Sequence, residues 1–208
     1  MSAGLPPRQA ILFTGHMVDA PDRPVARFPP ALVDAAARRI DAALADLDAG
    51  PRDVAFTEGA AGGDLLFAEA CLARGVPLTL LLPLAESEFV ARSLLPASDG
   101  AGWHARYRSL VARLASPPRA APDVLGPLPP GEDPFVRGNL WLLASALAAG
   151  AGRLRCVCLW DGGGGDGPGG TSHLVEAVRA AGGDVVRIDP RSLAAASARE
   201  GMPPGGAR

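Results

Sequence analysis

The sequence predicts an α/β protein with a mainly parallel sheet of about five strands and helices on both faces. Short apolar runs alternate along the chain with longer segments of helical periodicity, a pattern typical of successive β-α-β units. One run, Leu78–Leu82, is apolar throughout, as expected for a strand that helices cover on both sides. The length of 208 residues and the hydrophobic fraction of 48% suit a single globular domain.

The boundaries of the elements follow from these runs and from the residues that flank them. Strands are expected at residues 11–14, 54–57, 78–82, 154–160 and 184–188. Helices are expected at residues 32–47, 64–74, 135–149 and 171–181, with two more between residues 85 and 114. The proline-rich segment 116–134 is expected to be an irregular excursion, and the domain is expected to span residues 1–194 before a disordered tail at 195–208.

The balance of charge argues against a protein that holds nucleic acid mainly through its phosphates. The net charge is −2, all 20 basic residues are arginines, and no basic block occurs. Binding dominated by phosphate contacts needs clustered cations that displace counterions. Arg106, Arg108 and Arg113 share one helical segment, and we interpret them as a solvated face. Nucleic acid is therefore not expected as a partner.

The sequence shows no signal for a membrane or for secretion. No stretch approaches the roughly 18 uninterrupted apolar residues that a membrane span needs, and the first residues lack the apolar core of a signal peptide. Cys71, Cys156 and Cys158 fall in apolar segments without CxxC spacing, so we interpret them as buried hydrophobic residues. We expect a cytoplasmic protein with no membrane partner and no metal site.

Three glycine-containing loops follow predicted strands and form the candidate site. They cover residues 14–16, 58–64 and 160–171. Ligands of open α/β sheets bind in the crevice outside the carboxyl ends of the strands, so we expect these loops to converge. The candidate ligand-binding residues are Thr14, Gly15, His16, Arg27, Glu58, Gly59, Ala61, Gly62, Asp64, Trp160, Asp161, Gly169, Gly170 and Thr171.

The segment Gly169-Gly170-Thr171 opens a predicted helix, and we interpret it as a cradle for a phosphate. Glycine lets backbone N–H groups approach an anion closely, and the helix adds the positive end of its dipole. The alternative is that residues 161–170 form a flexible connector. The sequence contains no GxxxxGK[ST] or GxSxG pattern, and the strand, loop and helix around residues 59–63 do not match GxGxxG, which weakens the case for an ATPase, a serine hydrolase or a nicotinamide-dependent dehydrogenase.

The polar candidates each have a functional and a structural interpretation. His16 either contacts a phosphate or base or caps the next segment. Glu58 either accepts from a pair of ribose hydroxyls or interacts with a helix dipole, whereas Asp64 is better explained as a structural residue in the first turn of a helix. Asp161 and Asp166 either bind ribose or magnesium or belong to ordinary Asp-Gly turns.

Aromatic and basic side chains near the loops leave similar alternatives. Trp160 either stacks on a base or points into the core. The turn-rich segment after the first strand carries Arg23 and Arg27. Arg27 either folds over a phosphate as part of a mobile lid, where a guanidinium offers two parallel hydrogen bonds, or is solvated. For Arg23 we prefer solvation at the surface.

Four segments of the chain together carry a family resemblance. They are FTGH at 13–16, EGAAGGDLLFAEA at 58–70, LLP at 81–83 and LWDGGGGDGPGGT at 159–171. With these segments the chain resembles the SLOG superfamily, which includes the DNA-processing Smf proteins, the LONELY GUY phosphoribohydrolases and nucleotide-sensing domains. The resemblance implies a Rossmann-like three-layer fold and a sensor domain for a nucleotide or an ADP-ribose-like ligand, in signalling or defence, with no further cofactor.

The hydrolases of that superfamily carry a pattern close to PGGxGTxxE, whose glutamate helps to cleave an N-glycosidic bond. Here PGGT at 168–171 departs from the pattern just before the threonine, Leu174 stands where the glutamate is expected, and Glu176 is turned by roughly 200° around the helix. We therefore expect binding without turnover. The alternatives are a nucleoside-monophosphate phosphoribohydrolase that uses Glu58 and, as in the Smf proteins, single-stranded DNA binding. Members are often oligomeric, which is compatible with a homo-oligomer.

Overall fold

The structure confirms the α/β fold and shows a sheet of six strands. The computed structural model describes residues 5–164 and 167–200, with side chains up to residue 195. Every strand pair is parallel, and the order across the sheet is β4-β3-β2-β1-β5-β6. The strands are β1 (Ala10–Gly15), β2 (Val54–Thr57), β3 (Leu78–Leu82), β4 (Arg119–Ala120), β5 (Leu154–Leu159) and β6 (Asp184–Ile188).

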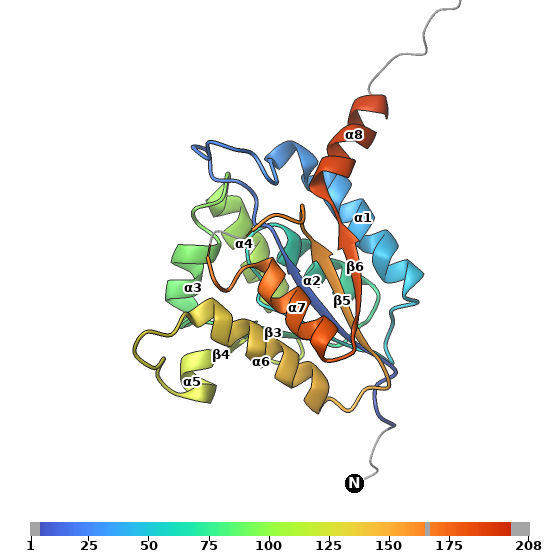
Figure 1. Ribbon diagram of the computed structural model, residues 1–208, viewed down its shortest axis with the longest axis vertical. Coiled ribbons are helices and arrows are strands. Elements are labelled where there is room, and N and C mark those ends of the chain that lie inside the picture. The colour runs from blue at the N-terminus through green and yellow to red at the C-terminus, as the bar shows by residue number, and fades with distance from the viewer. Residues whose placement is uncertain (1–4, 165–166, 201–208) are drawn as a thin grey trace, which may run out of the picture.

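Helices cover both faces of this sheet and complete a Rossmann-like, three-layer arrangement (Figure 1). After a short 3-10 turn at Pro30–Leu32, they are α1 (Val33–Asp46), α2 (Gly63–Ala73), α3 (Glu86–Ser93), α4 (Gly100–Val111), α5 (Ala121–Leu125), α6 (Pro134–Ala148), α7 (Thr171–Ala180) and α8 (Pro190–Glu200). α6 and α7 pack on the face that points toward the viewer in Figure 1, whereas α1 and α2 pack on the other.

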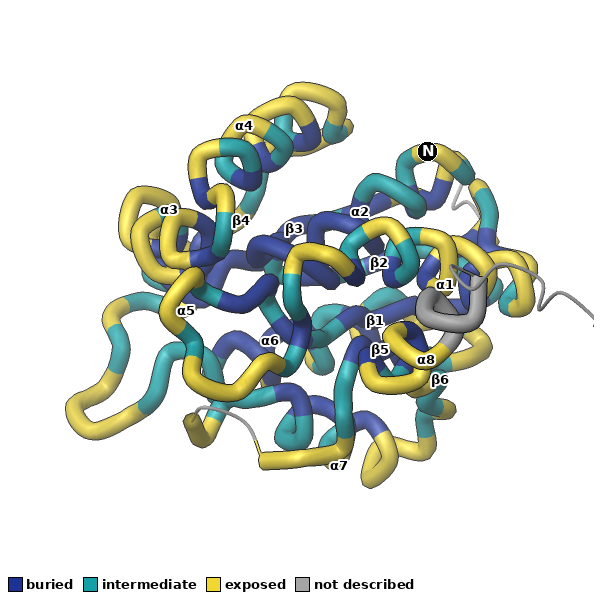
Figure 2. Tube along the Cα trace, turned by 90° about the horizontal axis from the view of Figure 1, so that it is seen from above, coloured by how far each residue is buried: buried dark blue, intermediate teal, exposed yellow. Residues whose placement is uncertain are grey.

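The two halves of the core follow from the alternation of side chains along the strands. Successive side chains of a strand point to opposite faces of the sheet. In β1, Ile11 and Phe13 pack with the side chains of α1 and α2, whereas Ala10 and Leu12 pack with those of α6 and α7. Figure 2 shows the buried residues along the strands and the exposed ones on the outer helices. Burial on both faces explains why these strands are continuous apolar runs.

The order of the strands changes direction next to β1. From β1 the chain adds β2, β3 and β4 on one side, and then crosses over through α6 to β5 on the other side. β1 and β5 approach each other closely at Gly15. A Cβ atom added at this glycine would lie only 3.0 Å from the Cβ atom of Leu159. Such a reversal leaves a crevice outside the carboxyl ends of the two strands, where ligands of open α/β sheets bind.

Two parts of the chain differ from the expectation. The segment 116–134 contains the strand β4 and the short helix α5. Periodicity does not predict β4, because it is only two residues long and pairs by its backbone with the end of β3. α8 runs to Glu200 and covers residues 195–200 of the expected tail. Residues 201–208, and Asp166 of the glycine-rich run, lie outside the described residues.

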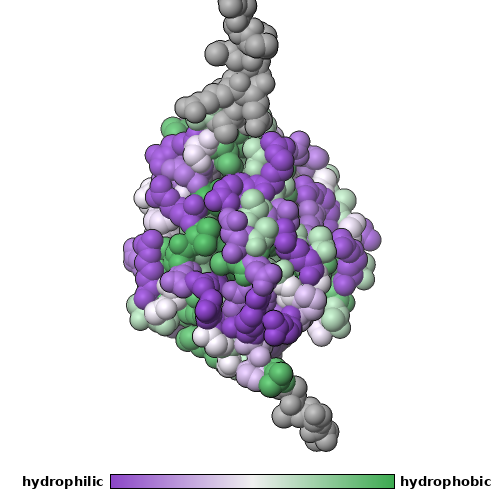
Figure 3. Space-filling view, turned by 90° about the vertical axis from the view of Figure 1, so that its right-hand side faces the viewer, coloured by the Kyte–Doolittle hydropathy of each residue, from purple (hydrophilic) through white to green (hydrophobic). Residues whose placement is uncertain are grey.

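The described surface is mostly polar, and the cysteines are enclosed. On the face drawn in Figure 3, hydrophilic residues predominate and hydrophobic ones form smaller groups between them. No helix among the described residues is long and apolar enough to cross a membrane. Cys71, Cys156 and Cys158 are buried, as the sequence predicts. Burial raises the pKa of the Cys158 thiol to about 11, and it raises those of the other two thiols as well.

Candidate functional site

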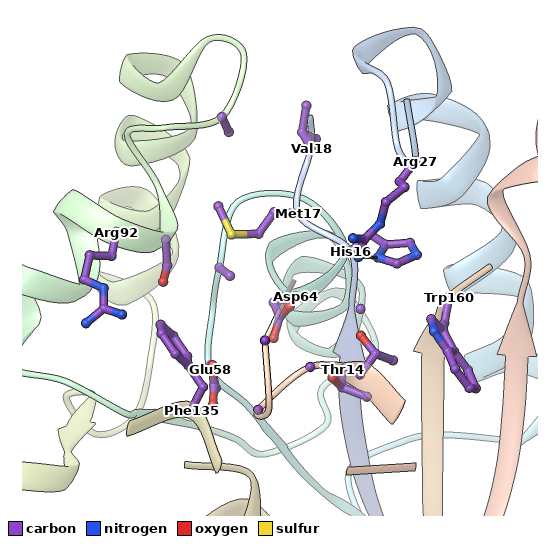
Figure 4. A pocket seen from close by; sticks show the side chains of 18 of the residues that line it. Thr14, His16, Met17, Val18, Arg27, Glu58, Asp64, Arg92, Phe135 and Trp160 are labelled. Carbon is purple, nitrogen blue, oxygen red and sulfur yellow. Dashed lines mark hydrogen bonds between the residues drawn. The ribbon is translucent and has the colours of Figure 1, made fainter. Parts of the chain in front are cut away.

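A cavity of about 480 Å³ lies at the carboxyl ends of β1, β2 and β5. Its volume falls within the range of about 300–1,000 Å³ that is usual for small-molecule sites. Figure 4 shows His16, Arg27 and Trp160 on one side of this cavity, Arg92 on the opposite side, and Glu58 between them. The residues therefore come from both sides of the strand reversal, as expected for a site at a switch point.

His16 positions Arg27 at the wall of the cavity. Arg27 Nη2 lies 3.2 Å from His16 Nδ1. Because a guanidinium only donates, Nδ1 must accept and the ring proton lies on Nε2, which is 3.2 Å from Asp161 Oδ1. The Asp161 N–H, 3.3 Å from the same Nε2, is then a contact and not a donor to it. Burial, followed by the charge of Arg27, lowers the pKa of His16, so the imidazole is neutral at pH 7.

Asp19 shapes the loop that carries Arg27. Its Oδ2 accepts hydrogen bonds from the backbone N–H groups of Arg27, at 2.9 Å, and Phe28, at 3.0 Å. Its backbone oxygen accepts from both the N–H and the hydroxyl group of Ser98, in the loop between α3 and α4. Arg23 pairs with Asp19 at 3.4 Å and also lines the cavity, so the solvated position expected for Arg23 is corrected.

Gly62 and Ala61 hold the loop after β1 and do not line the cavity. Val18 N–H donates to Ala61 O at 3.1 Å, and Gly63 N–H donates to His16 O at 3.4 Å. Gly62 has a φ of +110°, and a Cβ atom there would lie 2.8 Å from Val18 N. Both the positive φ and the close approach of the backbone require glycine at position 62. These contacts fix where His16 leaves β1.

The glycine-rich loop packs directly against the first turn of α6. A Cβ atom added at Gly169 would lie 2.5 Å from both Phe135 Cβ and Val136 N. Asn139 Nδ2 donates to Gly169 O at 2.8 Å and holds the loop from the same helix. Residues 167, 169 and 170 of the loop line the cavity. The described part of the loop is thus held at the cavity and does not behave as a free connector.

The start of α7 also faces the cavity. Gly170 is its N-cap residue, with no side-chain cap, and the buried Thr171 is its first residue. Gly170 has a φ of −68°, which any residue adopts, so a positive φ is not the reason for glycine at this position. Further along α7, Leu174 is buried in the core and Glu176 is exposed away from the cavity lining. Glu176, the glutamate nearest to the position in the PGGxGTxxE pattern, therefore does not reach the cavity.

The carboxyl groups of Asp64 and Asp133 are already hydrogen-bonded within the protein. Asp64 accepts from the Thr57 hydroxyl group at 2.5 Å and from the backbone N–H groups of Glu58, Gly59 and Asp64 itself, which supports a structural role. Burial raises its pKa to about 6 despite these donors. Asp133 caps α6, because its Oδ1 atom accepts from the N–H groups of Phe135 and Val136, both at 2.9 Å. Both side chains line the cavity.

Glu58, which follows β2, differs from these two residues. Its Oε1 atom is buried and has no hydrogen-bond partner among the described residues. Burial, and next the nearby charges of Asp64 and Asp133, raise the pKa of Glu58 well above its usual value. A carboxylate without donors in a low-dielectric site is costly, so the neutral form is favoured. Glu58 therefore presents to the cavity a carboxyl group whose raised pKa favours the neutral form.

No protein-family model matches the chain, and no curated protein matches it at a significant level. The described residues include no group of three or more histidine, cysteine, aspartate or glutamate side chains placed to hold a metal ion.

Most of the candidate residues meet at the cavity. It is lined by Thr14, Gly15, His16, Arg27, Glu58, Asp64, Trp160, Gly169, Gly170 and Thr171. Four candidates lie outside the lining: Gly59, Ala61, Gly62 and Asp161. Gly59 is buried against Leu80 with a φ of +91°. Asp161 does not reach the cavity itself, but its Oδ1 atom contacts Nε2 of His16, which does. The indole of Trp160 donates to Gly163 O at 2.8 Å and does not enter the core.

Further lining residues have no counterpart among the candidates. They come from the loop after β1, from α3 and α6 and from the loops next to these helices, and include Asp19, Arg92, Ser93, Asp133, Phe135, Asn139 and Leu142. The α6 residues are brought to the site by the crossover between β4 and β5, far from any strand end in the sequence. One signal was available: Gly138 and Asn139 interrupt an otherwise apolar helix, and glycine inside a helix costs about 1 kcal/mol relative to alanine.

Proposed function

We propose that the cavity binds a nucleotide-derived small molecule and that the protein is a ligand-binding domain of the SLOG kind. The observation that carries the proposal is the position of the cavity. It lies at the strand reversal between β1 and β5, with the uncapped start of α7 and Arg27 in its wall. Oriented N–H groups at a helix start and a guanidinium are a common combination for binding phosphate.

The distribution of charge in the lining supports a ligand with an anionic end. Arg23, Arg27 and Arg92 all line the cavity. Arg27 lies on one side of the cavity and Arg92 on the other, with Glu58 between them. Burial raises the pKa of Glu58, which favours its neutral form, and Asp64 and Asp133 each accept hydrogen bonds from the protein. A nucleotide fits this arrangement, because its phosphates can pair with an arginine and its uncharged base can occupy the remaining space.

Nucleotides are expected to raise the melting temperature of the purified protein. A ligand that binds only the folded state at a hundredfold excess over Kd stabilises it by about 2.7 kcal/mol. For a chain of this length that corresponds to a rise of roughly 5 °C or more. The panel should contain mono- and diphosphates of each base and ADP-ribose, with sodium phosphate at equal ionic strength as the control. Flat curves across the panel would contradict the proposal.

A second candidate function, N-glycosidic hydrolysis, is favoured by one observation. The neutral carboxyl group of Glu58 could act as a general acid toward a departing base, since a raised pKa suits that task. Against it stands the absence from the lining of Glu176, the carboxylate nearest to the hydrolase pattern. We therefore retain binding without turnover as the principal proposal.

Incubation with AMP, GMP and CMP is expected to release no free base above the background of a Glu58→Gln protein. Chromatography of the reaction over several hours provides the measurement, and the Glu58→Gln variant keeps the shape of the side chain while it lacks an acidic proton. Base release by the unmodified protein that is lost in Glu58→Gln would replace the binding proposal with the hydrolase.

A further inference from the structure

One oxygen of the Glu58 carboxyl group is enclosed by α6 and by the end of β3. A Cβ atom added at Gly138 would lie 2.7 Å from Glu58 Oε1 and 2.9 Å from Pro83 Cβ. Glycine at position 138 therefore makes room for the carboxyl group against the helix. Because Oε1 is buried while Glu58 lines the cavity, Oε2 is the oxygen left for a ligand.

The groups around Glu58 leave its Oε2 atom available to a ligand. Asp64 of α2 and Asp133 at the start of α6 are the charged residues that act on it. Asp64 accepts from the Thr57 hydroxyl group at the end of β2, and Asp133 accepts from the first N–H groups of α6. Arg92 of α3 lines the same cavity and pairs with Glu88 at 3.1 Å. With Oε1 unpartnered among the described residues and two carboxyl groups nearby, Glu58 keeps its proton, and Oε2 can donate it in a hydrogen bond.

An apolar wall lies beside this donor. Phe135, Gly138 and Leu142 follow one another at helical spacing on the side of α6 that faces Glu58, and the two large side chains line the cavity. Figure 4 shows the Phe135 ring next to Glu58 and on the side away from Arg27. Arg92 Cζ lies 5.1 Å from the centre of the Phe135 ring, so a guanidinium borders this surface as well. An apolar surface with hydrogen-bond donors at its edge suits a flat heteroaromatic ring that carries acceptors. A carboxyl group that accepts from both hydroxyl groups of a ribose would instead have to be ionised.

We propose that Glu58 recognises the base of the ligand by donating a hydrogen bond from Oε2 to a ring nitrogen or carbonyl oxygen, with Phe135 and Leu142 as the apolar side of this base subsite. The inference rests on the proposed function and deepens it. It also replaces the expectation that Glu58 accepts hydrogen bonds from ribose. The phosphates of the same ligand lie toward Arg27 and the start of α7.

The test compares AMP with ribose 5-phosphate, which has the same sugar phosphate but no base. Glu58→Gln keeps a donor, the amide N–H, at the place of the acid proton, whereas Glu58→Ala removes it. AMP affinity is expected to stay within about threefold in Glu58→Gln and to fall at least about tenfold in Glu58→Ala, since a lost buried hydrogen bond costs about 1–3 kcal/mol. Ribose 5-phosphate should bind all three proteins alike, and Glu176→Ala is the matched control at an exposed carboxylate.

The outcomes separate this inference from the proposed function. Equal losses of AMP affinity in Glu58→Gln and Glu58→Ala would mean that a carboxylate is required, and would overturn the inference alone. So would a loss of ribose 5-phosphate affinity in Glu58→Ala that matches the loss for AMP, or AMP affinity unchanged in Glu58→Ala. No binding of AMP, while other nucleotides raise the melting temperature, would also overturn only the inference. A flat nucleotide panel would overturn both.

Discussion

Replacing Gly169 with alanine is expected to lower nucleotide affinity by at least about tenfold while the sheet stays folded. The added Cβ atom would lie 2.5 Å from Val136 N and from Phe135 Cβ, and neither atom is the end of a flexible side chain. The loop must therefore move away from α6 and give up the hydrogen bond from Asn139 to Gly169 O. Displacement of a site by about 1 Å is enough to disable it. Isothermal titration with AMP measures the effect.

Gly167→Ala is the matched control within the same loop. Gly167 also lines the cavity, but a Cβ atom there meets nothing within 4 Å. Affinity is expected to stay within about threefold, because no neighbour has to shift. Circular dichroism should give the same spectrum for both variants. Unchanged affinity in a folded Gly169→Ala protein would place the phosphate elsewhere, and an equal loss in Gly167→Ala would show that the packing against α6 is not the cause.

Asp53→Ala should remove about 1–3 kcal/mol from the free energy of unfolding, the loss usual when a buried hydrogen-bond acceptor is deleted and its donors lose their partner. Asp53 is 1% exposed and accepts hydrogen bonds from Arg8, Gln9 and the Gly50 N–H group. Burial raises the pKa of Asp53, but these donors outweigh it and lower the pKa overall. The alanine variant leaves all three donors without their acceptor at the end of the sheet opposite the cavity. Urea denaturation measures the loss.

Asp48→Ala provides the comparison, because Asp48 pairs with the same arginine from the surface. Its side chain is 90% exposed, and exposed ion pairs contribute about 0–1 kcal/mol. Both variants therefore remove an aspartate that pairs with Arg8, but Asp53 is buried and Asp48 is exposed. A similar, small loss in both would mean that the Asp53 cluster is dispensable for the fold.

The strands were predictable where hydrophobic burial alone defines them. β2, β3 and β6 coincide with the expected ranges because each is an apolar run between turn-forming residues. β4 was not predictable in this way, because its two residues join the sheet through backbone hydrogen bonds with β3 and contribute no apolar run. The helix α7 was predictable because its buried residues form an apolar stripe in the sequence. The segment 116–134 has no such stripe, so its short strand and helix were not predicted.

The candidate site was predictable on the side of the strands and not on the side of the helices. A loop after a parallel strand must open at one edge of the sheet, so the sequence alone is enough to place Thr14, Glu58 and Trp160 together. Phe135 and Asn139 reach the same cavity only because the crossover helix α6 lies beneath the glycine-rich loop. That contact is a matter of packing between distant segments, which no local pattern encodes.

The place of β1 in the sheet has a consequence for the growing chain on the ribosome. Of the six strands of this sheet, β1 is synthesised first, and its neighbours are β2 and β5. One side of β1 can pair as soon as β2 emerges, but the other remains an open edge until residues 154–159 have left the exit tunnel. Unpaired edges of this kind are where nascent chains associate wrongly. The nascent sheet therefore keeps an open edge at β1 until β5 has followed α6, and the cavity is completed only when α7 follows.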